Sequence, residues 1–158
     1  QDLFNYRYNW MFSDPWYIGF ALGWERDPIR DLDNRYTAGL LAGRDIFDDA
    51  TKFLTFFAGI GYSDEEIGGV SEGGTVGFWS VRYEHELWGG VDFFHRHDLT
   101  QQFYGLDNLI VTTTTGIKFD VIDDLYTNIS YRYDYETEPA EGASKDDSTL
   151  QVGVGYEF

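Results

Sequence analysis

Apolar and polar side chains alternate along almost the whole chain with a period of two residues. The alternation is clearest near the start, where Tyr6 and Tyr8 alternate with Arg7 and Asn9. Successive side chains of a β-strand point to opposite faces, so this pattern predicts strands with one apolar and one polar face. No stretch has the periodicity of a helix. We expect nine strands, at residues 2–13, 16–26, 34–46, 52–63, 75–87, 91–102, 108–120, 125–136 and 148–158.

The lengths of the connections distinguish a membrane barrel from a soluble sandwich, since both contain alternating strands. The connections after strands one, three, five and seven are short, whereas those at 27–33, 64–74, 103–107 and 137–147 are longer. Short periplasmic turns that alternate with longer extracellular loops are typical of transmembrane barrels. Each strand also has roughly the ~9–11 residues needed to cross a bilayer. We therefore predict an all-β, antiparallel, up-and-down transmembrane β-barrel in one domain, residues 1–158.

Aromatic residues on the apolar face gather at the strand ends. Trp10 and Trp16 lie near the short turns, Trp24 and Tyr36 lie near the long loops, and aliphatic residues such as Leu40 lie between them. Two aromatic belts around an aliphatic band match the two interfaces of a membrane. The residues that we expect to face outward are Trp16, Phe20, Leu40, Phe56, Val111, Ile129 and Val152.

The spacing of residues at the C-terminus points to a bacterial outer membrane. Gln151, Gly153, Tyr156 and Phe158 resemble the C-terminal signal that the barrel-assembly machinery of Gram-negative bacteria recognises. The alternative is an ordinary final strand that ends in Phe. The first interpretation makes that machinery a partner during biogenesis, with outer-membrane lipid and lipopolysaccharide as the surroundings. It places the C-terminus in the periplasm and the long loops outside the cell.

Composition narrows the function classes. The chain has 12 Tyr, 13 Phe and 5 Trp but only 3 Pro, which favours strands. It has no Cys, so disulfides and thiolate metal sites are excluded, and its net charge of −17 argues against a nucleic-acid partner. No apolar run is long enough for a transmembrane helix. A mean hydropathy of −0.39 is compatible with alternating barrel strands. Gln1 is preceded by no signal peptide, so we expect a mature or truncated N-terminus.

Several segments carry a family resemblance. They are residues 81–88 (VRYEHELW), 93–99 (FFHRHDL), 115–119 (TGIKF), 130–135 (SYRYDY), 138–142, 145–148 and 153–158. Together they resemble the salt-induced outer membrane protein family (YdiY-like). The resemblance implies an outer-membrane barrel whose biochemical activity is not established, so no catalytic residue carries over.

The same resemblance implies that the barrel has more strands than this chain supplies. Family members carry about three further N-terminal strands, and nine plus three gives an even total of about twelve, as single-chain bacterial barrels require. We therefore expect that the strands at 2–13 and 148–158 do not pair with each other. Upstream strands or a second chain would complete both edges.

The polar face carries many charges, which we expect to line the lumen. They are Arg7, Glu25, Asp45, Arg82, Glu84, Glu86, Asp92, Arg96, Asp98, Lys118, Arg132, Asp134 and Glu157. Charges in a dry interior are costly unless they are paired or hydrated, so we expect Arg82 and Arg132 each to meet a carboxylate. Two interpretations stay open: a salt-bridged plug that fills a small barrel, or a narrow aqueous pore.

Candidate catalytic and metal-binding residues are few. His95 and His97 alternate with Arg96 and Asp98, so the two pairs point to opposite faces and form no dyad. Ser80 lacks the glycines of a nucleophile elbow. The acidic loops have no EF-hand spacing and are better interpreted as solvated charge. We expect no catalytic residue, no metal site and no cofactor.

The sequence therefore predicts a non-enzymatic outer-membrane barrel that acts as an envelope scaffold or a narrow diffusion channel. The family resemblance adds a link to salt or osmotic stress. The alternative is an outer-membrane enzyme that acts on lipid or peptide at the extracellular side.

Overall fold

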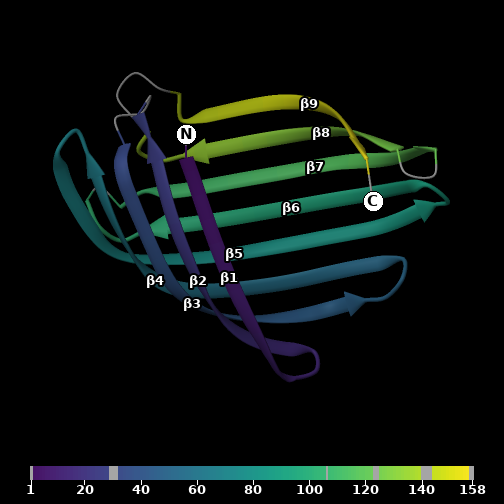
Figure 1. Ribbon diagram of the computed structural model, residues 1–158, viewed down its shortest axis with the longest axis horizontal. Helices are drawn as coiled ribbons and strands as arrows, with labels where there is room; N and C mark the ends of the chain where they lie inside the picture. The colour runs from purple at the N-terminus through teal and green to yellow at the C-terminus, as the bar shows by residue number, and fades with distance from the viewer. Residues whose placement is uncertain (1, 29–31, 106, 123–124, 140–143, 157–158) are drawn as a thin grey trace.

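The computed structural model describes residues 2–28, 32–105, 107–122, 125–139 and 144–156. Within these ranges the chain forms one antiparallel sheet of nine strands in sequence order (Figure 1). The strands are β1 (Asp2–Ser13), β2 (Trp16–Asp27), β3 (Leu32–Asp48), β4 (Lys52–Ile67), β5 (Val70–Trp88), β6 (Val91–Gln102), β7 (Leu109–Ile122), β8 (Leu125–Glu136) and β9 (Asp146–Tyr156). The all-β, up-and-down prediction is confirmed. No helix in the described ranges is both long and apolar enough to span a membrane.

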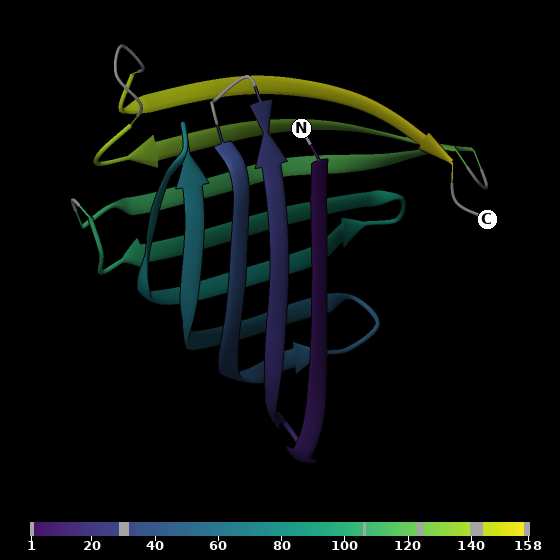
Figure 2. The same cartoon turned by 60° about the vertical axis from the view of Figure 1, so that its left-hand side comes forward.

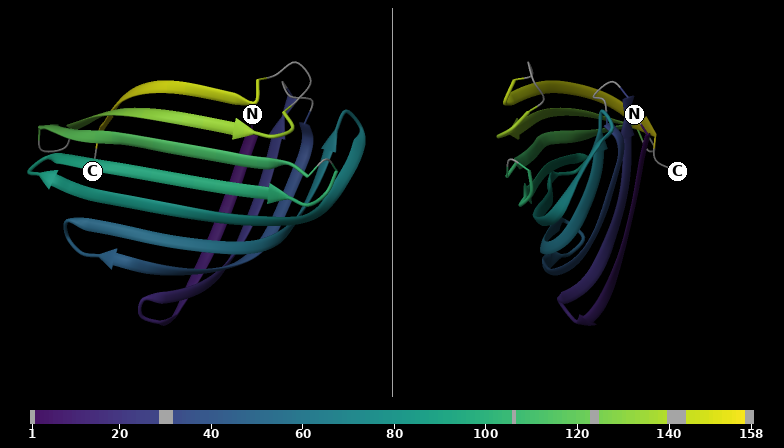
Figure 3. Two further views of the ribbon diagram at one scale, coloured as in Figure 1. Left: turned by 180° about the vertical axis from the view of Figure 1, so that it is seen from behind. Right: turned by 90° about the vertical axis from the view of Figure 1, so that its left-hand side faces the viewer.

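The sheet is strongly curved and has a concave and a convex face. Figure 2 shows β1 and β2 crossing in front of β5–β7, with β3 and β4 curving round to join the two parts. The sheet is open, as the edge view in Figure 3 shows. Among the described residues β1 pairs with β2 alone and β9 with β8 alone, so the prediction that the outer strands do not pair is confirmed.

One predicted loop is instead a hairpin. β4 continues to Ile67 and β5 begins at Val70, and only Gly68 and Gly69 connect them. Both glycines have a positive φ, 56° and 79°, which a type I′ turn requires at its two central positions. The expected long connection at 64–74 is therefore wrong. Its acidic residues belong to β4, which pairs with β3 as far as Ile67, and to the part of β5 that extends beyond β6.

The two faces of the sheet differ in chemistry. Tyr17, Leu41 and Phe57 form a small buried cluster on the concave face, and Phe78 packs against it. All seven residues predicted to face outward lie on the convex face. The register and the alternation of side chains place them on the side of the sheet opposite to that cluster. The exposed fraction of Leu40, for example, is 69%.

Glycines make room for the large rings on the concave face. A Cβ atom at Gly43 would collide with the ring of Tyr17, and one at Gly59 would collide with the ring of Phe78. The rings therefore lie close to these backbone positions on neighbouring strands. The buried cluster therefore depends on glycine as much as on its aromatic members.

Candidate functional site on the concave face

The predicted lumen charges share one face of the sheet. Directly opposed residues of neighbouring strands lie on the same face, and the register places these twelve on the concave face with Tyr17 and Phe57. They are Arg7, Glu25, Asp45, Arg82, Glu84, Glu86, Asp92, Arg96, Asp98, Lys118, Arg132 and Asp134. Glu157 and Phe158 lie outside the described residues, so the proposed assembly signal is described only at Gln151, Gly153 and Tyr156.

An ion-pair network lies at the long-loop end of this face. Arg35 on β3 is directly opposed by Glu25 on β2 and by Glu65 on β4. Its Nη1 lies 3.1 Å from Glu25 and its Nε lies 2.7 Å from Glu65. Nearby, Gln102 donates a hydrogen bond of 3.0 Å to the Tyr104 hydroxyl in the loop after β6, and burial raises the pKa of Tyr104. This end of the face is compact and its arginine is neutralised.

The centre of the face is arranged differently. Arg82 on β5 is directly opposed by Thr55 on β4 and by Arg96 on β6. Arg96 donates to Asp98 at 2.6 Å, so that carboxylate is already engaged. The Nε of Arg82 is buried without a hydrogen-bond partner, and no ion pair joins Arg82 to a carboxylate of the described chain. The prediction that Arg82 meets a carboxylate is wrong: its register neighbours are a threonine and another arginine, and the nearby Asp98 is engaged by Arg96.

Arg132 behaves as expected. Its Nε and Nη2 donate to Asp134 on the same strand, at 2.7 and 3.0 Å. Thr112 on β7 donates a further hydrogen bond of 2.7 Å to that carboxylate. The prediction for Arg132 is therefore confirmed, and the pair is fixed from two strands.

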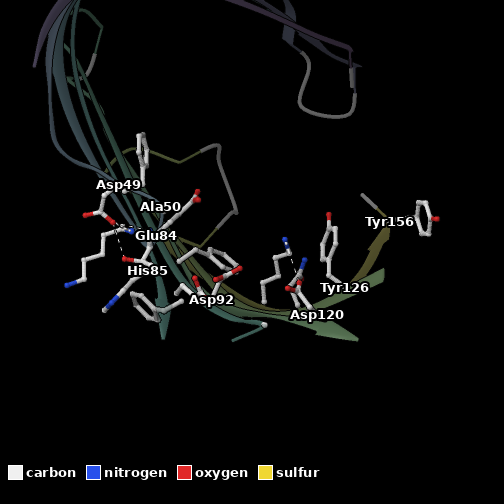
Figure 4. Close-up of a pocket in the computed structure, with 17 residues that line it drawn as sticks. Asp49, Ala50, Glu84, His85, Asp92, Asp120, Tyr126 and Tyr156 are labelled. Carbon is white, nitrogen blue, oxygen red and sulfur yellow. Dashed lines mark hydrogen bonds and ion pairs between the residues drawn. The ribbon is translucent and has the colours of Figure 1, made fainter. Parts of the chain in front are cut away.

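A hollow at the short-turn end is acidic. It has a volume of about 890 Å³, and Figure 4 shows its lining side chains from the β3–β4 turn across to β9. Five carboxylates and two lysines line it: Asp49, Glu84, Glu86, Asp92, Asp120, Lys52 and Lys118. The part of the chain that the structure describes contains no group of three or more residues arranged to hold a metal ion.

Hydrogen bonds within this hollow are local. The Oδ1 of Asp49 accepts hydrogen bonds from the backbone N and the Oγ1 of Thr51, at 2.9 and 3.0 Å, and from the backbone N of Lys52 at 2.8 Å. The Thr51 bonds, with the Lys52 amide, hold the pKa of Asp49 below its usual value. The Nζ of Lys118 lies 3.9 Å from Asp120 and 4.6 Å from the ring centre of Tyr126. These carboxylates therefore stabilise turns and strand ends.

The histidines lie on the other side of the sheet. The Nδ1 of His95 is 2.7 Å from the Oγ1 of Thr115, and that of His97 is 2.8 Å from the Oγ1 of Thr113. The register places these pairs on the convex face, away from Arg96. The prediction that these histidines and the neighbouring Arg96 and Asp98 point to opposite faces is confirmed.

Comparison with known families identifies the chain's relatives. A family model described as "Protein of unknown function, DUF481" matches residues 1–158. The chain belongs to the DUF481 family. This is the family of YdiY-like salt-induced outer membrane proteins, so the resemblance found in the sequence motifs is confirmed. Searches of curated proteins and of solved structures gave no significant match.

Membership of the DUF481 family assigns no activity. The structure adds three polar residues of the concave face that the sequence did not single out as parts of a site. Arg35 lies within a predicted strand and alternates with Tyr36, which was a sufficient signal for its position on the polar face. Glu65 was assigned to a loop because the acidic run at 64–66 resembles solvated loop sequence. The sequence argues only against a nucleophilic role for Ser80, and nothing in it indicates that the hydroxyl is buried without a partner.

Proposed function

We propose that this protein is an outer-membrane β-barrel whose polar concave face lines a narrow diffusion channel. The observation that carries the proposal is the distribution of hydrophobic side chains. Among the described residues, twenty-nine large hydrophobic side chains are exposed and only five hydrophobic residues are buried. Burial of apolar surface is the dominant favourable term in the folding of soluble proteins, so this distribution is the reverse of a soluble domain.

Exposed apolar side chains follow the convex face of the edge strand β9. On β9, Leu150, Val152 and Val154 alternate along the convex face with exposed fractions of 70%, 69% and 74%. Soluble monomers rarely expose apolar patches larger than a few hundred Å². Lipid is the surrounding that makes such a face favourable, and the polar face then turns away from lipid.

Closure of the barrel is part of the proposal. The free edges of β1 and β9 carry unpaired backbone groups, which are not tolerated against hydrocarbon. We propose that further strands, from the same protein or from a second chain, pair with both edges. Twelve strands in total would satisfy the even number of single-chain bacterial barrels.

The unneutralised Arg82 favours a water-filled channel over a dry plug. A guanidinium without an ion-pair partner must be hydrated or bind an anion, because an isolated charge in a dry interior is prohibitively unfavourable. We propose a non-enzymatic role, which the separation of the histidines from Arg96 and Asp98 supports. Outer-membrane lipid, lipopolysaccharide and the barrel-assembly machinery are the proposed partners. The family resemblance alone supports a role during salt stress.

Reconstitution tests this function directly. The complete protein should resist extraction of membranes with alkaline carbonate and require detergent for solubility. In planar lipid bilayers it should produce discrete conductance steps. Recovery in the aqueous fraction would overturn the membrane assignment. A fully inserted protein without conductance would overturn the channel and leave an envelope scaffold.

A further inference from the structure

Three arginines meet at the centre of the concave face, two on neighbouring strands and the third on β1 at the edge of the sheet. Arg82 and Arg96 are directly opposed on β5 and β6. Arg7 on β1 reaches across the curved sheet, and its Cζ lies 4.5 Å from the ring centre of Phe57 on β4. Phe57 is itself the register partner of Ser80, two residues before Arg82. The charges of Arg96 and Arg7 both act on Arg82, with Asp98 as the opposing charge.

This centre carries a net positive charge in a strongly acidic protein. One cavity of about 630 Å³ is lined by four arginines, the three above and Arg35, and by two carboxylates, Glu25 and Asp98. Glu25 contacts Arg35, and Asp98 contacts Arg96. Glu65 is a third carboxylate because it also contacts Arg35, so four positive charges against three negative ones leave an excess of one. The whole chain has a net charge of −17, so a local cationic excess is contrary to its average composition.

The arrangement is unfavourable unless something binds there. Like charges on directly opposed residues destabilise a strand pair. Native structures nearly always provide a partner for buried polar groups, and each exception calls for an explanation. The two side-chain atoms of the described chain that are buried without a partner are the Ser80 Oγ and the Arg82 Nε. They lie two positions apart on the same face of β5, and Ser80 is only 1% exposed.

We propose that Arg7, Arg82, Arg96 and the Ser80 hydroxyl form a binding site for a phosphate group carried by a small solute. Guanidinium groups bind the oxygens of phosphate in a bidentate manner, and a hydroxyl donates one further hydrogen bond. An oxyanion would neutralise the opposed arginines and supply acceptors for both orphaned donors. The site deepens the proposed channel function, on which it rests for its physiological role, by naming the class of solute that the passage selects.

The test measures binding in detergent, where no conductance is needed. The complete protein is titrated with inorganic phosphate and, separately, with glycerol 3-phosphate, by calorimetry at constant ionic strength set with chloride. We expect saturable binding of at least one of the two, and the tighter one distinguishes free phosphate from a phosphate ester. Arg82→Gln should weaken binding at least tenfold. Arg132→Gln is the matched control, since Arg132 lies on the same face but is fully engaged by Asp134, and it should bind as the unaltered protein does.

A second variant keeps the test informative if Arg82→Gln does not fold. Ser80→Ala removes only the buried hydroxyl and should weaken binding several-fold. Equal binding by the unaltered protein and both variants, or no binding beyond the effect of chloride, would overturn the site. Binding without conductance would overturn the channel and leave the site standing. Conductance without phosphate binding would overturn the site and leave the channel standing.

Discussion

Two arginines on the same concave face, Arg35 and Arg82, have opposite electrostatic surroundings. Arg35 has a glutamate directly opposite on each neighbouring strand, whereas Arg82 has a threonine on one side and an arginine on the other. Both residues alternate with aromatic neighbours in the sequence, so period-two patterning treats them alike. Cross-strand register decides which arginine stabilises the sheet and which remains available for water or an anion.

The largest expected effect comes from removing the neutralised arginine. Arg35→Met would remove the cation that lies between the carboxylates of Glu25 and Glu65. We expect a loss of about 3 kcal/mol in the free energy of unfolding, as when one partner of a buried ion pair is removed. Urea unfolding of the detergent-solubilised protein measures this. Adding Glu25→Gln and Glu65→Gln should recover most of the loss. If Arg35→Met lowered the free energy of unfolding no more than Arg82→Met does, the proposed difference between the two arginines would be contradicted.

Removing the unneutralised arginine should have a smaller effect of the opposite sign. Arg82→Met relieves the repulsion with Arg96 and leaves no carboxylate unpaired. In phosphate-free buffer of low ionic strength, we expect the free energy of unfolding to rise by up to about 1 kcal/mol, the range for like charges on opposed positions. The same unfolding experiment measures it, and raising the salt concentration should reduce the difference. A clear destabilisation would mean that Arg82 has a stabilising partner after all.

One substitution should give the arginines at the centre of the concave face a directly opposed carboxylate, as Arg35 has. Thr114 on β7 is directly opposed by Arg96 and by Arg132. In Thr114→Glu a carboxylate would lie between two arginines, as a mirror image of Arg35 between two glutamates. We expect a gain of about 0.5 kcal/mol in unfolding free energy, since opposite charges across strands stabilise modestly. Thr114→Gln is the uncharged control. If both variants behave alike, register neighbours do not set the electrostatics of this face.

The smallest expected effect is that of Asp49, which lies in the turn between β3 and β4, at the other end of the face from Arg35. The lowered pKa of Asp49 means that its ionised form stabilises the fold above its ordinary pKa, and that this contribution is lost as the pH falls through the lowered pKa. Asp49→Asn should therefore lower stability slightly at neutral pH, and the difference from the unaltered protein should vanish in acid. A difference that is independent of pH would show that the carboxylate charge of Asp49 is not involved.

Much of the fold was predictable because the side-chain period of a strand is local. The register of alternating residues placed Trp16, Leu40 and Val152 on the convex face without any tertiary information. The β4–β5 hairpin was missed because the acidic residues around Gly68 and Gly69 outweighed the turn signal that the two glycines carry. Local polarity was a poorer guide there than the turn chemistry.

The candidate site was predictable only in outline. The charged residues could be assigned to one face, but pairing depends on which residues lie opposite each other across strands. That register placed Arg82 against Arg96, whereas Arg132 pairs with Asp134 two residues further along its own strand. The approach of Arg7 to Phe57 depends on the curvature of the whole sheet, which no local pattern encodes.

The central claim is that the convex face contacts lipid while the concave face contacts water, and site-directed spin labelling tests it most directly. The chain has no native cysteine, so single cysteines can be introduced at each of residues 149–154 of β9 and labelled after reconstitution into lipid vesicles. We predict that collisions with oxygen are high at 150, 152 and 154, and that collisions with a water-soluble nickel chelate are high at 149, 151 and 153. High accessibility to the nickel chelate at every position would contradict the account.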